Sequence, residues 1–270
     1  MSALYVNSYT FGQVSLEFDD ADDAAESFAR VYSFERSSGS VASLCYSIKR
    51  TVSGVVVSIS DAGEALLPDY AAAFGYVDAD LDRRMRAVAS DLLLSVHASS
   101  AVIAGKAVIF LGLSGYGKTT LGIEVAKKSE GTLGDEYALV NPALGTVRFE
   151  PYPFQVKRAG APGIHIVCPS GTESRACHAD DLGLRLLSGS RELGTIVLPN
   201  RVSGLTSRAL APVSAAELHK RLMPSVLGNS DRKMTFRTLT KMISKFGIGV
   251  LEFRYGEASD ASDYLLEALG

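Results

Sequence analysis

The stretch AVIFLGLSGYGKTTLGIEVAKK, residues 107–128, decides the fold. Residues 107–111 form an apolar run typical of a buried strand, and residues 119–128 follow as a short helix after a glycine-rich break. The break matches the spacing G-x-x-x-x-G-K-[ST], and a strand before it and a helix after it are the context in which this motif binds phosphate. We therefore expect a nucleotide-binding loop here.

The residues of this loop are expected to divide the task of holding a nucleotide. Glycines let successive backbone N–H groups face the phosphates, and the helix start adds the positive end of its dipole. Lys118 is expected to reach the β- and γ-phosphate oxygens, and the Thr119 hydroxyl to bind Mg²⁺. The predicted nucleotide contacts are Gly112, Ser114, Gly115, Tyr116, Gly117, Lys118, Thr119 and Thr120.

A second strand-like run, HASSAVIA (97–104), comes just before the first. The pair Gly105-Lys106 between the two runs suits a two-residue turn, so we expect an antiparallel hairpin. With the strands paired directly across this turn, Ser100 lies opposite Leu111. This register carries His97 towards Ser114 in the glycine loop and predicts it beside the phosphates.

Asp135 follows Lys118 after one helix and one strand. Eleven or so helical residues lead about 16 Å away from the loop, and five or six extended residues lead back nearly as far. Asp135 is therefore expected near the phosphates, where it could bind Mg²⁺ or take a proton from an attacking hydroxyl. Glu136, a further metal-ligand candidate, points to the other face of a regular strand.

Composition narrows the class of protein. The chain has 270 residues, of which 47% are hydrophobic, which suits one large domain or a main domain with a smaller one. Lys and Arg number 27 against 30 Asp and Glu, so no global basic field indicates nucleic acid or an anionic membrane. Residues 1–13 lack a leader pattern, and no apolar run approaches the roughly 18 residues of a membrane span. We expect a cytoplasmic protein with neither partner.

Strand-like and helix-like patterns divide the chain at about residue 80. The runs GQVSLEF, VASLCYSI and VVVSIS predict a β-rich N-terminal region over residues 1–80. The acidic run DDADDAAE is expected to be a solvated loop or a helix start. Strands and helices alternate over residues 81–270, so the fold class is α/β, a P-loop core with a mixed sheet. Helices are expected over 80–94, 214–223, 231–246 and a last segment ending at Leu269.

Three segments in this order, HASSAV (97–102), GLSGYGKTT (112–120) and GDEYALV (134–140), resemble the HPr kinase/phosphorylase-like family. The nucleotide core of that family is similar to that of phosphoenolpyruvate carboxykinase. The resemblance implies a protein-serine kinase, unrelated in fold to eukaryotic kinases, that uses ATP and Mg²⁺. It makes His97 the active-site histidine, Lys118 the P-loop lysine, Thr119 the metal-binding hydroxyl and Asp135 the base. Glu136 stands where the family usually has a second aspartate.

One segment departs from the family pattern. FEPYPFQVKR (149–158) stands in place of the glycine-rich E-I-R-G-L-G-type segment with which the bifunctional enzyme binds metal and its partner protein. The chain thus looks more like the divergent HPr kinase-related proteins. Some of these belong to biosynthetic clusters for ribosomally made peptides, lasso peptides included, and phosphorylate a serine of the precursor. The implied partner is a peptide or protein with a serine or threonine acceptor.

Two other functions stay open: a switch or motor NTPase, and a small-molecule kinase that uses the same site. The hairpin before the loop and the early carboxylate favour the protein kinase, because switch and motor classes usually enter the loop from a more parallel sheet. The choice between ATP and GTP, and a homo-oligomeric state, are left open. Further phosphate or metal candidates are Glu150, Lys157, Arg158 and Arg201.

Overall fold

The computed structural model of the chain describes residues 3–19, 23–37, 42–87, 93–113, 115–157, 160–167, 171, 173–227 and 232–270. They form an α/β fold that divides into two units, each described here by itself. Unit 1 contains residues 1–88 and 151–181, and unit 2 contains residues 89–150 and 182–270. No helix in the described ranges is long and apolar enough to cross a membrane.

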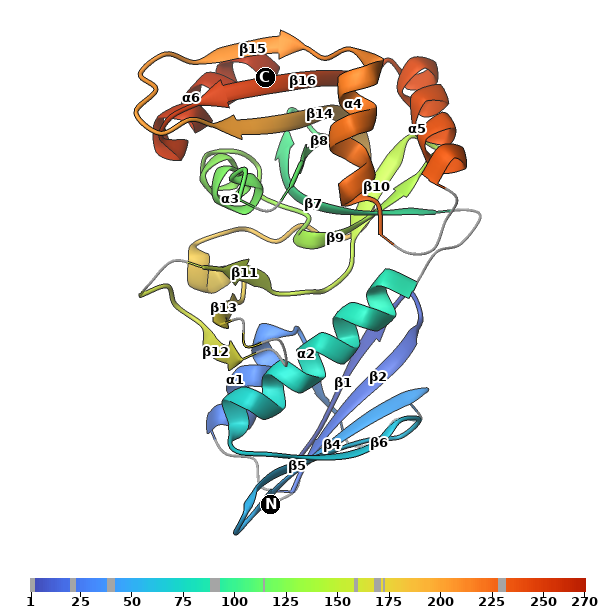
Figure 1. The fold of residues 1–270 in the computed structure, drawn as a ribbon, viewed down its shortest axis with the longest axis vertical. Helices are drawn as coiled ribbons and strands as arrows, with labels where there is room; N and C mark the ends of the chain where they lie inside the picture. The colour runs from blue at the N-terminus through green and yellow to red at the C-terminus, as the bar shows by residue number, and fades with distance from the viewer. Residues whose placement is uncertain are drawn as a thin grey trace. The chain divides into compact units, whose positions relative to one another are not determined.

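Unit 1 contains a six-stranded sheet in the order β3-β1-β2-β4-β5-β6 (Figure 1). Its strands are β1 (Ala3–Tyr9), β2 (Gly12–Phe18), β3 (Glu35–Ser37), β4 (Leu44–Thr51), β5 (Gly54–Ile59) and β6 (Gly63–Leu67). Helix α1 (Asp23–Val31) begins within the acidic run, and α2 (Tyr70–Ala87) crosses one face of the sheet. Phe28 of α1 stacks on Phe74 of α2 with 4.3 Å between ring centroids, which joins the two helices in one core.

Helix α2 corrects the helix expected over residues 80–94. It begins ten residues earlier, at Tyr70, because Phe74, Val77, Leu81 and Met85 form one buried stripe at helical spacing. The next strand begins at Leu94, and residues 88–92 lie outside the described part of the chain. The predicted division at residue 80 therefore falls inside a continuous helix.

The segment 151–181 also belongs with unit 1, although it was expected in the second domain. It forms a three-stranded sheet in the order β11-β13-β12, built from β11 (Phe154–Val156), β12 (Ile164–Val167) and β13 (Glu173–Cys177), and ends in the short 3₁₀ helix η1 (Asp180–Leu182). The buried Asp78 carboxylate of α2 accepts hydrogen bonds from the hydroxyls of Tyr32 and Tyr152. A buried carboxylate needs such donors, and the segment 151–181 supplies both Tyr152 and the Gln155 amide, which donates at 3.4 Å.

Unit 2 is built on a seven-stranded mixed sheet in the order β10-β9-β7-β8-β14-β16-β15 (Figure 1). Its strands are β7 (Leu94–Ile103), β8 (Lys106–Leu111), β9 (Asp135–Asn141), β10 (Thr146–Phe149), β14 (Arg191–Arg201), β15 (Ala209–Pro212) and β16 (Gly249–Tyr255). Strand β8 is antiparallel to β7 and parallel to β14, which is parallel to β16. The sheet curls far enough for β10 to pair with β14 as well.

Helices cover both faces of this sheet. They are α3 (Lys118–Lys128), α4 (Ala215–Leu222), α5 (Arg232–Phe246) and α6 (Ala258–Leu269), with the short 3₁₀ helix η2 (Met223–Ser225) after α4. On one face, Leu218 of α4 and Leu239 of α5 join the core formed by Val96, Ala98 and Ile109. On the other face, α3 packs against β7, β8 and α6. The helices expected over 214–223 and 231–246 and before Leu269 are thus confirmed to within one residue.

The hairpin between β7 and β8 forms, but its register differs from the expected one. The turn residues are Ala104 and Gly105, with φ of 50° and 75°, and Ser100 lies opposite Ile109. A tight hairpin turn of this type needs positive φ at both central residues. Gly105 adopts positive φ easily at the second position, where Lys106 would be strained in the expected register. The shift is two residues, so each side chain keeps its face of the sheet.

Replacing Ala104 by Asn should stabilise the protein. Ala104 has a left-handed backbone, which costs an L-residue roughly 1 kcal/mol and which Asn tolerates better. Chemical denaturation should therefore show a free energy of unfolding higher by about 1 kcal/mol. Ala143→Asn, in an exposed turn where φ is not positive, is the matched control and should give no gain. Equal effects of the two substitutions would contradict the turn assignment.

Candidate functional site

The glycine loop joins the end of β8 to the start of α3. Gly112, Gly115 and Gly117 have φ of 150°, 89° and 89°, a backbone conformation that favours glycine. Helix α3 begins at Lys118, directly after Gly117. Alternating backbone conformations at a helix start turn N–H groups into a shared concavity, which is the geometry of an anion-binding nest.

Two distant side chains hold the ends of the loop. The Ser225 hydroxyl donates to the Gly112 carbonyl at 3.3 Å, and the Tyr255 hydroxyl donates to the Gly117 carbonyl at 3.4 Å. A Cβ atom on Gly117 would lie 2.3 Å from the Tyr255 hydroxyl oxygen. Glycine is therefore required at residue 117 by close approach as well as by its φ.

Lys118 is the buried cation of the loop. Its residue is 6% exposed, and its ammonium donates to the Leu113 carbonyl at 3.3 Å, so the side chain folds back over the loop that it follows. Three further predicted contacts, Gly115, Tyr116 and Thr120, are exposed beside it. Ser114, also predicted as a contact, lies outside the described residues.

The structure brings Asp135 to the start of α3. Asp135 is the first residue of β9 and is 1% exposed, and its Oδ2 accepts a hydrogen bond from the Thr119 hydroxyl at 3.0 Å. Ser99 of β7 lies directly opposite Asp135 in the strand pair. Helix α3 approaches β7 closely at this point, since a Cβ on Gly122 would lie 2.2 Å from the Ser99 hydroxyl oxygen. Small residues thus allow the helix to close over the carboxylate.

Glu136 departs from the regular strand that was expected. Its φ is 70°, and its Oε2 lies 2.9 Å from His97 Nε2. Since His97 and Ser99 share a face of β7, and Ser99 lies opposite Asp135, this contact places Glu136 with Asp135 rather than on the other face. Left-handed backbone at a non-glycine residue is costly and is concentrated at functional sites.

Burial and a neighbouring charge shift the protonation of Asp135. The pKa of its carboxyl group is raised to about 8, chiefly by removal from water and also by the nearby Glu136 carboxylate. The hydroxyls of Ser99 and Thr119 and the ammonium of Lys118 act in the opposite direction. The carboxyl group therefore exchanges its proton near neutral pH, as a general acid or base does.

The other candidates lie at different places. Arg201 is the last residue of β14, and its Cβ lies 3.8 Å from the position that a Cβ on Gly117 would occupy. Its guanidinium donates a hydrogen bond to the Glu257 carboxylate at 3.2 Å. Glu150 is buried opposite Tyr137, next to β9, with Arg148 at 3.8 Å. Lys157 belongs to unit 1, and Arg158 lies outside the described residues. Arg201 is therefore the one of the four that the structure places against the loop.

These donors suit a nucleotide and Mg²⁺. The loop offers backbone N–H groups and Lys118 to phosphate, and Thr119, Asp135 and Glu136 offer oxygen atoms, which Mg²⁺ prefers. Among the described residues, no group of three or more His, Cys, Asp or Glu side chains forms a metal cage. Mg²⁺ usually takes one or two carboxylates and completes its shell with phosphate and water, so two acids beside a phosphate loop fit it.

Three residues at this site escaped the sequence reasoning. Ser99 lies on the same face of β7 as His97, and the alternation of side chains along HASSAV could have predicted this. Ser225 and Tyr255 reach the loop from segments more than a hundred residues away. No local pattern marks such long-range contacts.

Comparison with known proteins found no matching family model and no matching curated protein. Among solved structures, the HPr(Ser) kinase/phosphatase from Coxiella burnetii is similar with a TM-score of 0.28 and 12% sequence identity. The match covers 65% of this chain and 99% of that chain.

The raised pKa of Asp135 predicts a pH-dependent stability in the absence of nucleotide and divalent metal. The folded state holds a proton that the unfolded chain releases at about pH 4, so stability should fall as pH rises from there through about 8. Urea denaturation at pH 5, 6.5 and 8 in the presence of EDTA measures this. The free energy of unfolding of the Asp135→Asn variant should rise relative to that of the native protein as pH rises.

Asp260→Asn, which changes an exposed carboxyl group, is the control for that series. Its stability should follow the native curve at all three pH values. Parallel curves for Asp135→Asn and the native protein would show that residue 135 does not take up the proton.

Proposed function

We propose that the protein is an ATP- and Mg²⁺-dependent kinase that transfers phosphate to a serine or threonine hydroxyl of a peptide or protein. The observation that carries the proposal is the buried Asp135 carboxyl group, hydrogen-bonded to Thr119 at the start of the helix that follows the glycine loop. A group that exchanges a proton near neutral pH, one contact from a phosphate-binding helix start, supports phosphoryl transfer better than binding alone.

The chain's own groups would hold the phosphates. The backbone N–H groups of Gly115, Tyr116 and Gly117 would face them, and Lys118 would turn from the Leu113 carbonyl to their oxygens. The hydroxyl of Thr119 and the carboxylates of Asp135 and Glu136 would hold Mg²⁺. Mg²⁺ neutralises charge on the phosphate oxygens when bound.

Asp135 would act as the base. As the acceptor oxygen forms its bond to the γ-phosphorus and the bond from that phosphorus to the bridging oxygen breaks, the hydroxyl proton passes to the Asp135 carboxylate, and ADP leaves. His97, paired with Glu136 at 2.9 Å, would then donate to the transferring oxygens while Glu136 keeps its ring oriented. Both functions require the left-handed turn at Glu136.

The acceptor that we propose is macromolecular, with a ribosomally made peptide precursor of the lasso type as the peptide class and the cytoplasm as the place of reaction. The loop residues Tyr116 and Leu113 are exposed, at 39% and 47%. Exposed side chains at the loop suit contact with a peptide better than enclosure of a metabolite.

Lys118→Ala and Asp135→Asn should separate binding from chemistry. Lys118 contacts phosphate before reaction, so its loss should weaken ATP binding, whereas Asp135 acts as the proton moves, so its loss should lower kcat by about 10²–10⁴-fold. Titration with a fluorescent ATP analogue and steady-state phosphoryl transfer measure the two effects. Lys127→Ala, on the exposed side of the same helix, is the control and should change neither. Native kcat in Asp135→Asn would refute the base assignment.

Labelled ATP should identify the class of acceptor. The protein is incubated with γ-labelled ATP, Mg²⁺, serine-containing peptides encoded by neighbouring genes, and a panel of small alcohols. Label in an acid-stable phosphopeptide is expected. Label confined to a small molecule would support a small-molecule kinase instead, and released phosphate with no labelled acceptor would support a switch or motor NTPase.

A further inference from the structure

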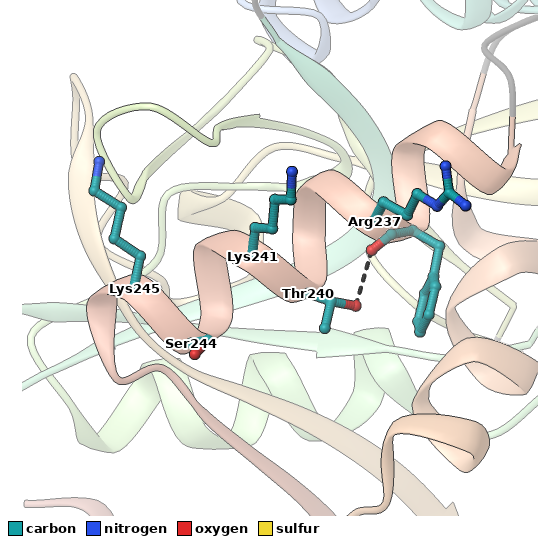
Figure 2. A pocket seen from close by; sticks show the side chains of 6 residues that line it. Arg237, Thr240, Lys241, Ser244 and Lys245 are labelled. Atoms are coloured by element: carbon teal, nitrogen blue, oxygen red, sulfur yellow. Dashed lines mark hydrogen bonds between the residues drawn. The ribbon is translucent and has the colours of Figure 1, made fainter.

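Helix α5 of unit 2 carries a row of cations along one side. Arg237, Lys241 and Lys245 are exposed and follow each other at four-residue intervals. Figure 2 shows their charged groups projecting from the same side of the helix. Residues four apart in a helix are neighbours on its surface, about 6 Å apart along the axis.

These cations border a groove of about 680 Å³ along the helix. Phe236, Thr240 and Ser244 line the rest of it, and Thr240 and Ser244 are labelled in Figure 2. The Phe236 ring is half-buried against His219, and the Thr240 hydroxyl donates to the Phe236 carbonyl at 2.9 Å. The groove therefore offers an aromatic surface beside a line of positive charge.

The positive charge of α5 is not balanced within the described residues. The helix has no acidic residue, and none of its three exposed cations forms an ion pair with a carboxylate in the described ranges. Lys245 donates instead to a neutral acceptor, the Ala143 carbonyl, at 3.2 Å. Elsewhere in unit 2 such pairs do form, as between Lys128 and Asp263 at 2.8 Å.

The row also contrasts with the charge of the rest of the protein. The chain as a whole carries a net charge of -3. A local row of positive charge on a chain of net negative charge indicates a function for this surface.

We propose that this groove is a docking surface for an extended acidic peptide segment with carboxylates at alternate residues. Alternate side chains of an extended chain point the same way about 6.6 Å apart, which matches the 6 Å spacing of the cations. The Phe236 ring, which also lines the groove, would contact apolar parts of the bound segment beside the cations. Charge complementarity and the matched spacing both select this occupant.

A peptide fits better than a polyanion of another class. The row is one helix wide and its charge is local, while the net charge of -3 repels a long nucleic acid or an anionic membrane beyond the groove. The Phe236 ring also offers apolar contact beside the charges. These features favour a short segment that lies along α5.

Docking here does not depend on the proposed phosphoryl transfer. Leu239 and Met242 of α5 pack on the sheet face that holds Val96 and Ala98, whereas α3 packs on the face of Ser99. The groove and helix α3 thus lie on opposite faces of the unit 2 sheet. Peptide binding can be measured without nucleotide, so failure of the kinase proposal and failure of this one are distinguishable.

Fluorescence anisotropy with a labelled ten-residue peptide tests the proposal. The peptide carries aspartates at alternate positions and is compared with a peptide of the same composition whose aspartates form one block and with an asparagine version. The native protein should bind the alternating peptide tightest, and more weakly at 200 mM than at 50 mM salt. An exposed ion pair contributes about 0.2–1 kcal/mol, so Lys241→Gln should weaken binding about 2- to 5-fold.

The combined variant Arg237→Gln, Lys241→Gln, Lys245→Gln should weaken binding by about 10-fold or more. Lys220→Gln, which removes an exposed charge from α4, should bind as the native protein does. Thermal unfolding checks that each variant is folded, which the exposure of the substituted side chains favours.

Four results would overturn the proposal. Native-like binding by the folded triple variant would remove the role of the cations, and equal binding of the asparagine peptide would remove the charge requirement. Tighter binding of single-stranded DNA or of phosphatidylserine vesicles than of the alternating peptide would assign the surface to a different partner. Equal binding of the block peptide would overturn the alternate spacing.

Discussion

The candidate site depends on one strand, β7, which is hydrogen-bonded along both edges. Its pairing with β8 fixes the strand that enters the glycine loop, and its pairing with β9 fixes the strand that begins with Asp135. The same strand supplies His97 and Ser99. A shift of one residue in the register would move every side chain of a strand to the other face of the sheet. The pairing of β7 with β8 and β9 therefore keeps the glycine loop, His97 and the two acidic residues together more firmly than side-chain contacts alone would.

The parts of the candidate site that lie close together in the sequence could be predicted from the sequence alone. The loop spacing located Gly112 to Thr119, and the rise of helix and strand predicted the return of Asp135 to Thr119, which are 3.0 Å apart. The hairpin was predicted with a turn one residue too late, since the pattern of apolar residues does not distinguish Ala104-Gly105 from Gly105-Lys106. The left-handed turn at Glu136 was missed because nothing in the residue type requires it.

Contacts between distant segments were beyond sequence reasoning for a different reason. Tyr255 and Ser225 reach the loop only because β16 and η2 end beside it, and Arg201 because β14 is parallel to β8. Each depends on strand order, which one sequence does not encode in any local pattern. At the site itself, burial of Asp135 and positive φ at Glu136 both reduce stability, and well-packed surroundings such as the Gly122 and Ser99 contact hold them in place.

The hydrogen bonds to Asp78 have a consequence for synthesis of the chain. Tyr32 is available as soon as residues 1–88 leave the ribosome, but Tyr152 and Gln155 follow only after the whole of 89–150 has been made. At about 5–20 residues per second, the nascent chain waits several seconds without these two donors, and strands β11–β13 are not yet made. Unit 1 therefore begins to fold first and is completed only when part of unit 2 has already emerged.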